Sequence, residues 1–288
     1  MAYQVPAISN EILVSFPAEH VMLLTFNRPK SLNAMTPTMA KDIDTVLTWF
    51  DNEPSLWGER VSSDTATYVQ SELENLRAAV NGFGSISRRS SSPKPIIAAV
   101  NGGAYGGGTE MLLNCDIVIA SEDAVIALPE VKRGVYAAMG EFVWLLPGLA
   151  SEMLLTGRTV PAHEAATRFG LYVHSSLPHT CSAQLTHILT PNPLYPQLHS
   201  VNEVVPKDQL LPKALAWAQR IVENSPDSVQ ATKRALVLTN QIADVEDVVV
   251  QHSHTGEMSR LYGGDNIKIG LQAFAERRKP VWRNPAKL

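Results

Sequence analysis

Cysteine is scarce in this chain of 288 residues, which holds only Cys115 and Cys181 and no Cys-x-x-Cys pair. A disulfide framework would need more thiols, so we expect a reducing compartment. No apolar run approaches the roughly 18 residues of a membrane-spanning helix. Met1–Phe16 lacks the basic start and apolar core of a secretory signal. We therefore expect an intracellular protein without a membrane span.

Basic charge is not in excess either. The chain has 24 Lys and Arg against 28 Asp and Glu, a formal net charge of −4. Nucleic-acid-binding domains usually carry a basic face or stripe, so this balance argues against a nucleic-acid partner. The hydrophobic share of 45% is that of a globular protein with a substantial core.

One segment has no charge at all. Tyr172–Ser200 contains no Asp, Glu, Lys or Arg, yet it holds four prolines and four of the eight histidines. A loop of this length without secondary structure is uncommon in a compact domain, so we treat 172–200 as an atypical insert. Its histidines and Cys181 follow no spacing typical of zinc ligands, and no metal is expected.

The first half of the chain alternates strand-like and helix-like segments. Strands are expected at Val21–Phe26, Ile96–Val100 and Asp116–Ala120. Helices are expected from Pro37 to Phe50 with Thr36 as the N-cap, at Ser71–Ile86 and at Thr109–Cys115. This alternation is typical of parallel sheets and predicts an α/β fold. Three further helices follow, at Pro212–Asn224, Pro226–Leu238 and Ile267–Arg278, the last with Phe274 on its apolar face.

The most informative stretch begins at Pro95. An apolar run leads into Asn101-Gly-Gly-Ala-Tyr-Gly-Gly-Gly108, Glu110 follows on an expected helix, and Glu130 stands directly after Pro129. Glycines let backbone N–H groups approach a developing oxyanion closely, and two carboxylates can move protons. Each feature alone has a simpler explanation, a tight turn for the glycines and a dipole-complementing residue for a glutamate in a first helical turn. No Gly-Lys-Ser/Thr follows, so a phosphate loop is not indicated.

Together these motifs resemble the crotonase superfamily, also called the enoyl-CoA hydratase/isomerase family. The resemblance covers most of the chain through Thr25–Ala34, Lys94–Asp116, Leu128–Gly134, Ser151–Arg158, Val201–Pro206 and Gln272–Trp282. It implies a crotonase-like spiral of ββα units over residues 1–206 and a helical C-terminal trimerisation region over 207–288, assembled as a homotrimer or hexamer. It also implies an acyl-CoA thioester substrate and no separate cofactor, because coenzyme A is part of the substrate.

The resemblance also implies residue roles. Gly107 matches the family's oxyanion-hole donor, and Glu110 and Glu130 match the two carboxylates that its hydratases use. Coenzyme A would be bound at four positions that have a solvated basic surface as the alternative: Arg28, Lys30 and Leu32 in the loop after the first strand, and Lys279, which would reach the coenzyme A of a neighbouring subunit.

The reaction implied is the addition of water to a 2-enoyl-CoA. Attack at the β-carbon moves charge onto the thioester oxygen, where N–H donors stabilise it. One glutamate would deprotonate the water while the other protonates the α-carbon. Two glutamates favour a hydratase over a Δ3-Δ2 enoyl-CoA isomerase, which can work with a single base at the position of Glu130. An acyl-CoA hydrolase and, from another class, an inactive CoA-binding subunit are the alternatives.

The chain departs from the family pattern in three places. Leu56–Asp64 lacks both the hydrophobic strand and the Ala-Gly-Ala-Asp type loop that carry the first oxyanion donor. We therefore expect a missing core strand, half an oxyanion hole and impaired folding. Gly134–Ala150 is shorter than usual, which puts the helix lining the acyl pocket in doubt. Removing 172–200 would join Leu171 to Val201 as in the family, and we hypothesise that the insert is a translated intron.

The last three residues, Ala286-Lys287-Leu288, are a close variant of the peroxisomal address Ser-Lys-Leu. We expect recognition by the peroxisomal import receptor and a peroxisomal location. A cytoplasmic protein with a frayed basic tail is the alternative.

Overall fold

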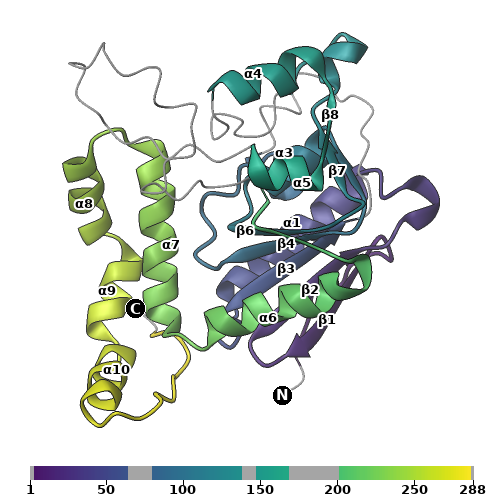
Figure 1. Ribbon diagram of the computed structural model, residues 1–288. Coiled ribbons are helices and arrows are strands. Elements are labelled where there is room, and N and C mark those ends of the chain that lie inside the picture. Colours follow the sequence, from purple (N-terminus) through teal and green to yellow (C-terminus); the bar gives the residue numbers. More distant parts are fainter. Residues whose placement is uncertain (1–2, 64–79, 138–146, 169–200, 287–288) are drawn as a thin grey trace.

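A six-stranded sheet forms the centre of the molecule (Figure 1). The structure is a computed structural model, and it describes residues 3–63, 80–137, 147–168 and 201–286. The strand order is β1-β2-β3-β4-β6-β9, with β1 antiparallel to β2 and the others parallel. The strands are β1 (Ile12–Ala18), β2 (Val21–Phe26), β3 (Gly58–Ser63), β4 (Ile96–Val100), β6 (Ile117–Ser121) and β9 (Glu203–Val205). The three strands expected from the sequence are confirmed as β2, β4 and β6.

β3 lies where the sequence predicts that a strand is missing. Val21 of β2 pairs with Gly58, and Glu59 pairs with Ile96 of β4, so β3 joins its two neighbours in parallel register. The expected loss of this core strand is therefore wrong. Its composition hides it, because Gly-Glu-Arg-Val-Ser-Ser contains a single apolar residue, whereas buried parallel strands usually read as continuous apolar runs. The position of an Ala-Gly-Ala-Asp type loop, 64–79, lies outside the described residues.

Helices α1 (Pro37–Asn52) and α6 (Leu210–Val222) cover the two faces of the large sheet (Figure 1). The predicted start of α1 is confirmed, because the Thr36 side chain accepts a hydrogen bond from the Met39 N–H at 3.0 Å. Its buried face packs on one side of the sheet through Met39, Ile43, Val46, Leu47 and Phe50. On the other side, α6 packs its own apolar stripe against Val21, Ile97 and Ile119.

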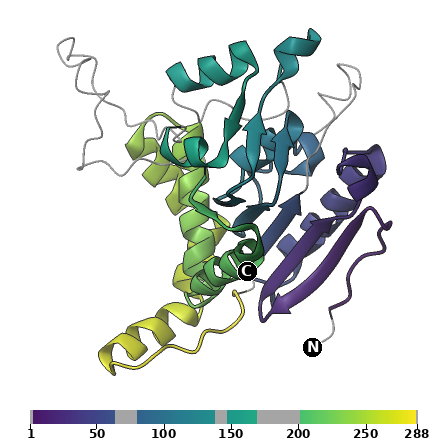
Figure 2. The ribbon, with the colours of Figure 1, turned by 45° about the vertical axis from the view of Figure 1, so that its right-hand side comes forward.

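A smaller sheet with its own helices lies over one end of the large sheet (Figure 2). Its strands run in the order β5 (Gly103–Tyr105), β7 (Val125–Ala127) and β8 (Thr159–Pro161). The helices beside it are α3 (Gly107–Leu113), α4 (Pro147–Thr156) and α5 (Ala162–Thr167). A common core joins these elements, and its buried members include Val100, Ile126, Leu128, Met153 and Val160.

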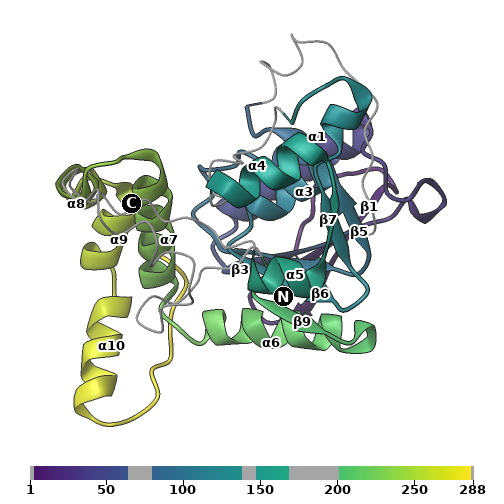
Figure 3. The ribbon, with the colours of Figure 1, turned by 45° about the horizontal axis from the view of Figure 1, so that its top comes forward.

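The remaining helices form an arm that stands beside the sheets (Figure 3). They are α7 (Pro226–Gln241), α8 (Val245–Ser253), α9 (Gly256–Gly263) and α10 (Asn266–Ala275). The predicted helices in this region are confirmed, with Pro212–Asn224 corresponding to α6. Phe274 of α10 is 87% exposed, so the apolar face expected there is uncovered in a single chain. The domain division at residue 206 and the trimerisation role stay predictions.

Two expected helices differ from the structure. The one placed at Thr109–Cys115 begins two residues earlier as α3, so Gly107 is its first residue. The one placed at Ser71–Ile86 does not extend through its described part. Gly82 and Gly84 take φ angles of +71° and +58°, so the chain makes a turn and the short 3-10 segment η2 (Phe83–Ser85) there. Residues 71–79 lie outside the described residues, as do 138–146 in the shortened segment and the whole of 172–200.

A buried lysine fastens the arm to the large sheet. The Lys233 ammonium of α7 donates to the Asp116 carboxylate at 2.8 Å and to the Lys94 carbonyl at 2.7 Å. The same carboxylate accepts a hydrogen bond from the Ile96 N–H at 2.6 Å. One ion pair therefore ties α7 to the starts of β4 and β6.

Replacing this lysine should cost far more stability than replacing an exposed one. Lys233→Met leaves a partly buried carboxylate without its cation, which we expect to lower the free energy of unfolding by about 3 kcal/mol, the lower end for a buried pair that loses one partner. Lys207→Met is the matched control, because its bridge to Asp123 joins side chains that are 59% and 53% exposed, and such bridges contribute about 0–1 kcal/mol. Equal losses in urea unfolding of the two variants would contradict the anchoring role.

Candidate active site

The glycine cluster turns the chain from β5 into α3. Gly106 has φ of +56°, in the left-handed region that favours glycine, and its N–H donates to the Ala127 carbonyl at 2.9 Å. The Thr109 hydroxyl lies 2.8 Å from the carbonyl oxygens of both Ala104 and Ala127. These contacts fix the turn to β7. Gly107, the predicted oxyanion donor, begins the helix, so its N–H has no acceptor within α3.

Neither glycine at this turn has room for a side chain. A Cβ atom on Gly106 would lie 2.7 Å from Oε1 of Glu130. A Cβ atom on Gly107 would lie 2.4 Å from the ring of Phe83. The first turn of α3 is thus held between a carboxylate on one side and an aromatic ring on the other.

Glu130 follows Pro129 and begins the short 3-10 segment η3 (Glu130–Arg133). Its Oε2 atom is buried and has no hydrogen-bond partner among the described residues. Burial raises the pKa of this carboxyl above its ordinary value, and a backbone hydrogen bond and the positive charge of Arg133 oppose the rise. A carboxyl with a raised pKa takes up and releases protons more readily near neutral pH. Its geometry and its pKa both suit proton transfer.

Glu110 belongs to the same turn. It lies in the first turn of α3, its residue is 3% exposed, and its N–H donates to the Gly106 carbonyl at 3.0 Å. Glu110 reaches Gly106 through the helix backbone, and Glu130 reaches it through its carboxylate. The structure therefore gathers Gly107, Glu110 and Glu130 around one turn, and their catalytic roles stay predictions.

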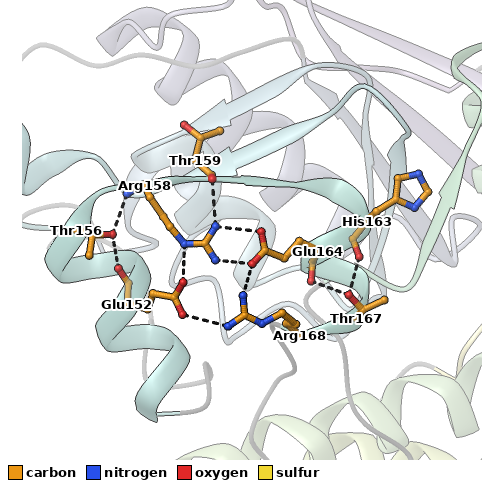
Figure 4. A network of polar contacts seen from close by, with 8 residues as sticks. All are labelled: Glu152, Thr156, Arg158, Thr159, His163, Glu164, Thr167 and Arg168. Atoms are coloured by element: carbon orange, nitrogen blue, oxygen red, sulfur yellow. Dashed lines mark hydrogen bonds and ion pairs between the residues drawn. The ribbon is translucent and has the colours of Figure 1, made fainter.

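A network of ion pairs joins α4, α5 and the residue before β8 (Figure 4). The Arg158 guanidinium lies between two carboxylates, 2.7 Å from Glu152 of α4 and 2.5 Å from Glu164 of α5. Arg168 bridges the same two carboxylates. The neighbouring Gly157 packs so closely on the turn before η3 that a Cβ atom there would lie 3.2 Å from Cα of Pro129. The network therefore ties α4 to α5, and Gly157 between them packs on the residue before η3.

The residues of the loop predicted to approach coenzyme A differ in their surroundings. Arg28 faces inward, with Nε 3.2 Å from the Glu11 carboxylate and a further hydrogen bond to the Ala34 carbonyl. Its N–H donates to the Asn33 side chain at 2.6 Å. Lys30 and Leu32 are exposed. Arg28 therefore shapes the loop, and its two neighbours face solvent.

Lys279 is not brought to this loop within one chain. It is exposed and follows α10. The chain after α10 lies across the molecule from the loop that follows β2 (Figures 1 and 2). Among the described residues, no cluster of three or more His, Cys, Asp or Glu could hold a metal ion, and no helix is long and apolar enough to span a membrane.

Phe83 is the site residue that sequence reasoning missed. It lies 24 positions before Gly107 in a segment expected to be helical, and only the folded chain brings its ring to that glycine. The one available signal was Asn81-Gly-Phe-Gly84, because two glycines flanking an aromatic residue predict a turn better than a helix.

Replacing Glu130 and replacing Glu164 should change the pH dependence of the free energy of unfolding in opposite directions. The pKa of Glu130 is raised from 4.5, so the native state is penalised when this group ionises. Glu130→Gln should match the wild type below that value and become the more stable protein as pH rises through the raised pKa. The hydrogen bond from Arg158 lowers the pKa of Glu164, so Glu164→Gln should be the less stable protein at pH 7 and lose that deficit in acid. Urea unfolding between about pH 2 and pH 8 measures both trends, and a common sign would contradict them.

The chain matches the family described as enoyl-CoA hydratase/isomerase over residues 69–179 and 199–285. The interval between the two matched parts lies within 172–200. The mevalonyl-coenzyme A hydratase of Aspergillus fumigatus is 37% identical over 96% of this chain and 96% of that protein. The carnitinyl-CoA dehydratase of Citrobacter koseri is 29% identical over 91% and 95%. A solved structure of an enoyl-CoA hydratase from Mycobacterium tuberculosis has a TM-score of 0.72 at 26% identity, covering 96% of this chain and 99% of that one. With its α/β crotonase-like fold, this chain belongs to the enoyl-CoA hydratase/isomerase family.

Proposed function

We propose that the protein catalyses the reversible addition of water to the double bond of a 2-enoyl-CoA thioester. The observation that carries this proposal is the Glu130 carboxylate, which lies against Gly106 with one oxygen buried and without a hydrogen-bond partner among the described residues. Such a group can hold the reacting water and accept its proton. The related mevalonyl-coenzyme A hydratase and carnitinyl-CoA dehydratase support a hydratase or dehydratase.

The reaction uses three groups around one turn. The Gly107 N–H donates to the thioester oxygen as charge develops there, an interaction worth about 2.7–4 kcal/mol in comparable sites. One glutamate removes a proton from the water, and its hydroxide forms a bond to the β-carbon. The other glutamate delivers a proton to the α-carbon. In the reverse direction, a 3-hydroxyacyl-CoA loses water through the same groups.

Mevalonyl-CoA is the substrate to test first. Relatives from Aspergillus fumigatus and Beauveria bassiana, 37% and 32% identical over nearly their whole lengths, are named mevalonyl-CoA hydratases. Mevalonyl-CoA carries a hydroxyl group at C3, so loss of water between C2 and C3 needs the chemistry described above. A short unbranched 2-enoyl-CoA is the comparison substrate.

The cellular location and the oligomeric state of the protein are also proposed. A peroxisomal location follows from Ala286-Lys287-Leu288 as a ligand of the import receptor, with the cytoplasm as the alternative. A homotrimer or hexamer would cover the exposed apolar side chains of the arm, among them Val249, Leu271 and Phe274. It would also bring Lys279 of one copy near the coenzyme A of the next.

Replacing each glutamate separately tests the proposed roles. Glu110→Gln and Glu130→Gln should each lower kcat for hydration at least about 100-fold, the contribution typical of a positioned acid or base. Glu122→Gln is the control, because Glu122 is exposed in the loop after β6 and should keep full activity. Hydration is followed by the loss of the enoyl thioester absorbance.

The other functions would give distinct results in the same assays. Isomerisation that survives Glu110→Gln and is lost in Glu130→Gln identifies a Δ3-Δ2 isomerase. Release of a free thiol identifies an acyl-CoA hydrolase. The missing Ala-Gly-Ala-Asp motif favours an inactive CoA-binding subunit as the second candidate, and binding of acyl-CoA by the wild type without turnover would identify it.

A further inference from the structure

We propose that Phe83 is a positioning residue that fixes the orientation of the Gly107 N–H toward the thioester oxygen. The inference rests on the proposed function for its chemistry and on the packing around α3 for its geometry. Phe83 is 5% exposed, and its ring fills the space that a side chain on Gly107 would take, 2.4 Å from the Cβ position. Among the residues that the structure describes, Phe83 supplies the atoms nearest to that position.

The segment that carries Phe83 is locked onto α3 along the length of the helix. At the middle of α3, a Cβ atom on Gly84 would lie 2.5 Å from Sδ of Met111. At its end, the Asn114 side chain donates to the Ile86 carbonyl at 2.6 Å. The Phe83 N–H donates to the Ser87 hydroxyl at 2.7 Å, which fixes the turn itself. The segment therefore holds the Phe83 ring in a fixed position against Gly107.

This support is needed because the backbone at the start of α3 has an intrinsically wide range of conformations. Three consecutive glycines, 106–108, precede the first side chain of a helix only seven residues long, and glycine has the widest range of backbone conformations. A hydrogen bond weakens steeply as its angle departs from linear, so a small rotation of the Gly107 peptide would misdirect its N–H. Glu130 packs against Gly106 and Phe83 packs against Gly107, so a side chain supports each of the two glycines.

A pair of complementary substitutions tests the contact. Gly107→Ala alone should lower kcat strongly, because the new methyl group meets the Phe83 ring. Phe83→Ala alone should lower kcat by about 10-fold or more with little change in KM, since misplacement of a reacting group by about 1 Å can cost 100-fold. In the double variant the methyl group occupies the vacated space, so activity should exceed that of Gly107→Ala at least about 10-fold. Phe83→Leu should keep most of the wild-type rate.

Two controls separate positioning from general destabilisation. Gly106→Ala combined with Phe83→Ala should show no recovery, because a methyl group on Gly106 meets Glu130 instead. Leu47→Ala removes a buried side chain from the same core cluster without touching Gly107. It should lower stability while leaving kcat within about 2-fold.

A binding measurement keeps this inference separate from the proposed function. Bound hexadienoyl-CoA absorbs at longer wavelength when an N–H donor polarises its thioester, whether or not it reacts. The shift should be large in the wild type and in Leu47→Ala and reduced in Phe83→Ala. A shift in the wild type without any turnover overturns the proposed function alone. Unchanged shift and kcat in Phe83→Ala, or no recovery in the double variant, overturns the role of Phe83. A wild type with neither shift nor turnover overturns both.

Discussion

The close approach of Glu130 and Phe83 to two adjacent glycines is the constraint on which the site depends. Oε1 of Glu130 occupies the side-chain space of Gly106, and the Phe83 ring occupies that of Gly107. A side chain on Gly106 would displace the Glu130 carboxylate, and one on Gly107 would displace the Phe83 ring. The same constraint explains why Glu130 is partly desolvated, because its carboxylate lies against backbone where water would otherwise be. The raised pKa of Glu130 is a consequence of the packing.

Residues that are far apart in the sequence hold this turn in place. The Arg158 network joins α4, β8 and α5 and holds Gly157 on the turn that precedes Glu130. Gly84 of η2 and Ile86, the residue after η2, contact α3. The Thr109 hydroxyl contacts the carbonyl oxygens of Ala104 in β5 and Ala127 in β7, which fixes the turn to both strands. The site therefore lies where the small sheet meets the large one, and the arm is anchored elsewhere, through Lys233 and Asp116.

The sequence predicts those elements whose own residues carry the pattern. β4 was predictable because its five residues are all apolar and buried, and α1 because Thr36 and Pro37 mark its start. β3 was not, because hydrogen bonds to β2 and β4 define it and its side chains do not. The two glutamates and Gly107 were identified by resemblance to a family. The contact of Phe83 with Gly107 depends on tertiary folding over 24 positions, and no local pattern encodes it. Val201, the first residue after the expected insert, is 1% exposed and is buried in the core beside β6.

The central claim is that this turn adds water to an enoyl thioester through a protonation at the α-carbon. The most direct test is to run the wild-type reaction on a 2-enoyl-CoA in D₂O and to examine the product by mass spectrometry and NMR. The account predicts a 3-hydroxyacyl-CoA with one deuterium at C2. Recovery of the unreacted thioester would contradict it, and so would free coenzyme A or a shifted double bond without a hydroxyl group.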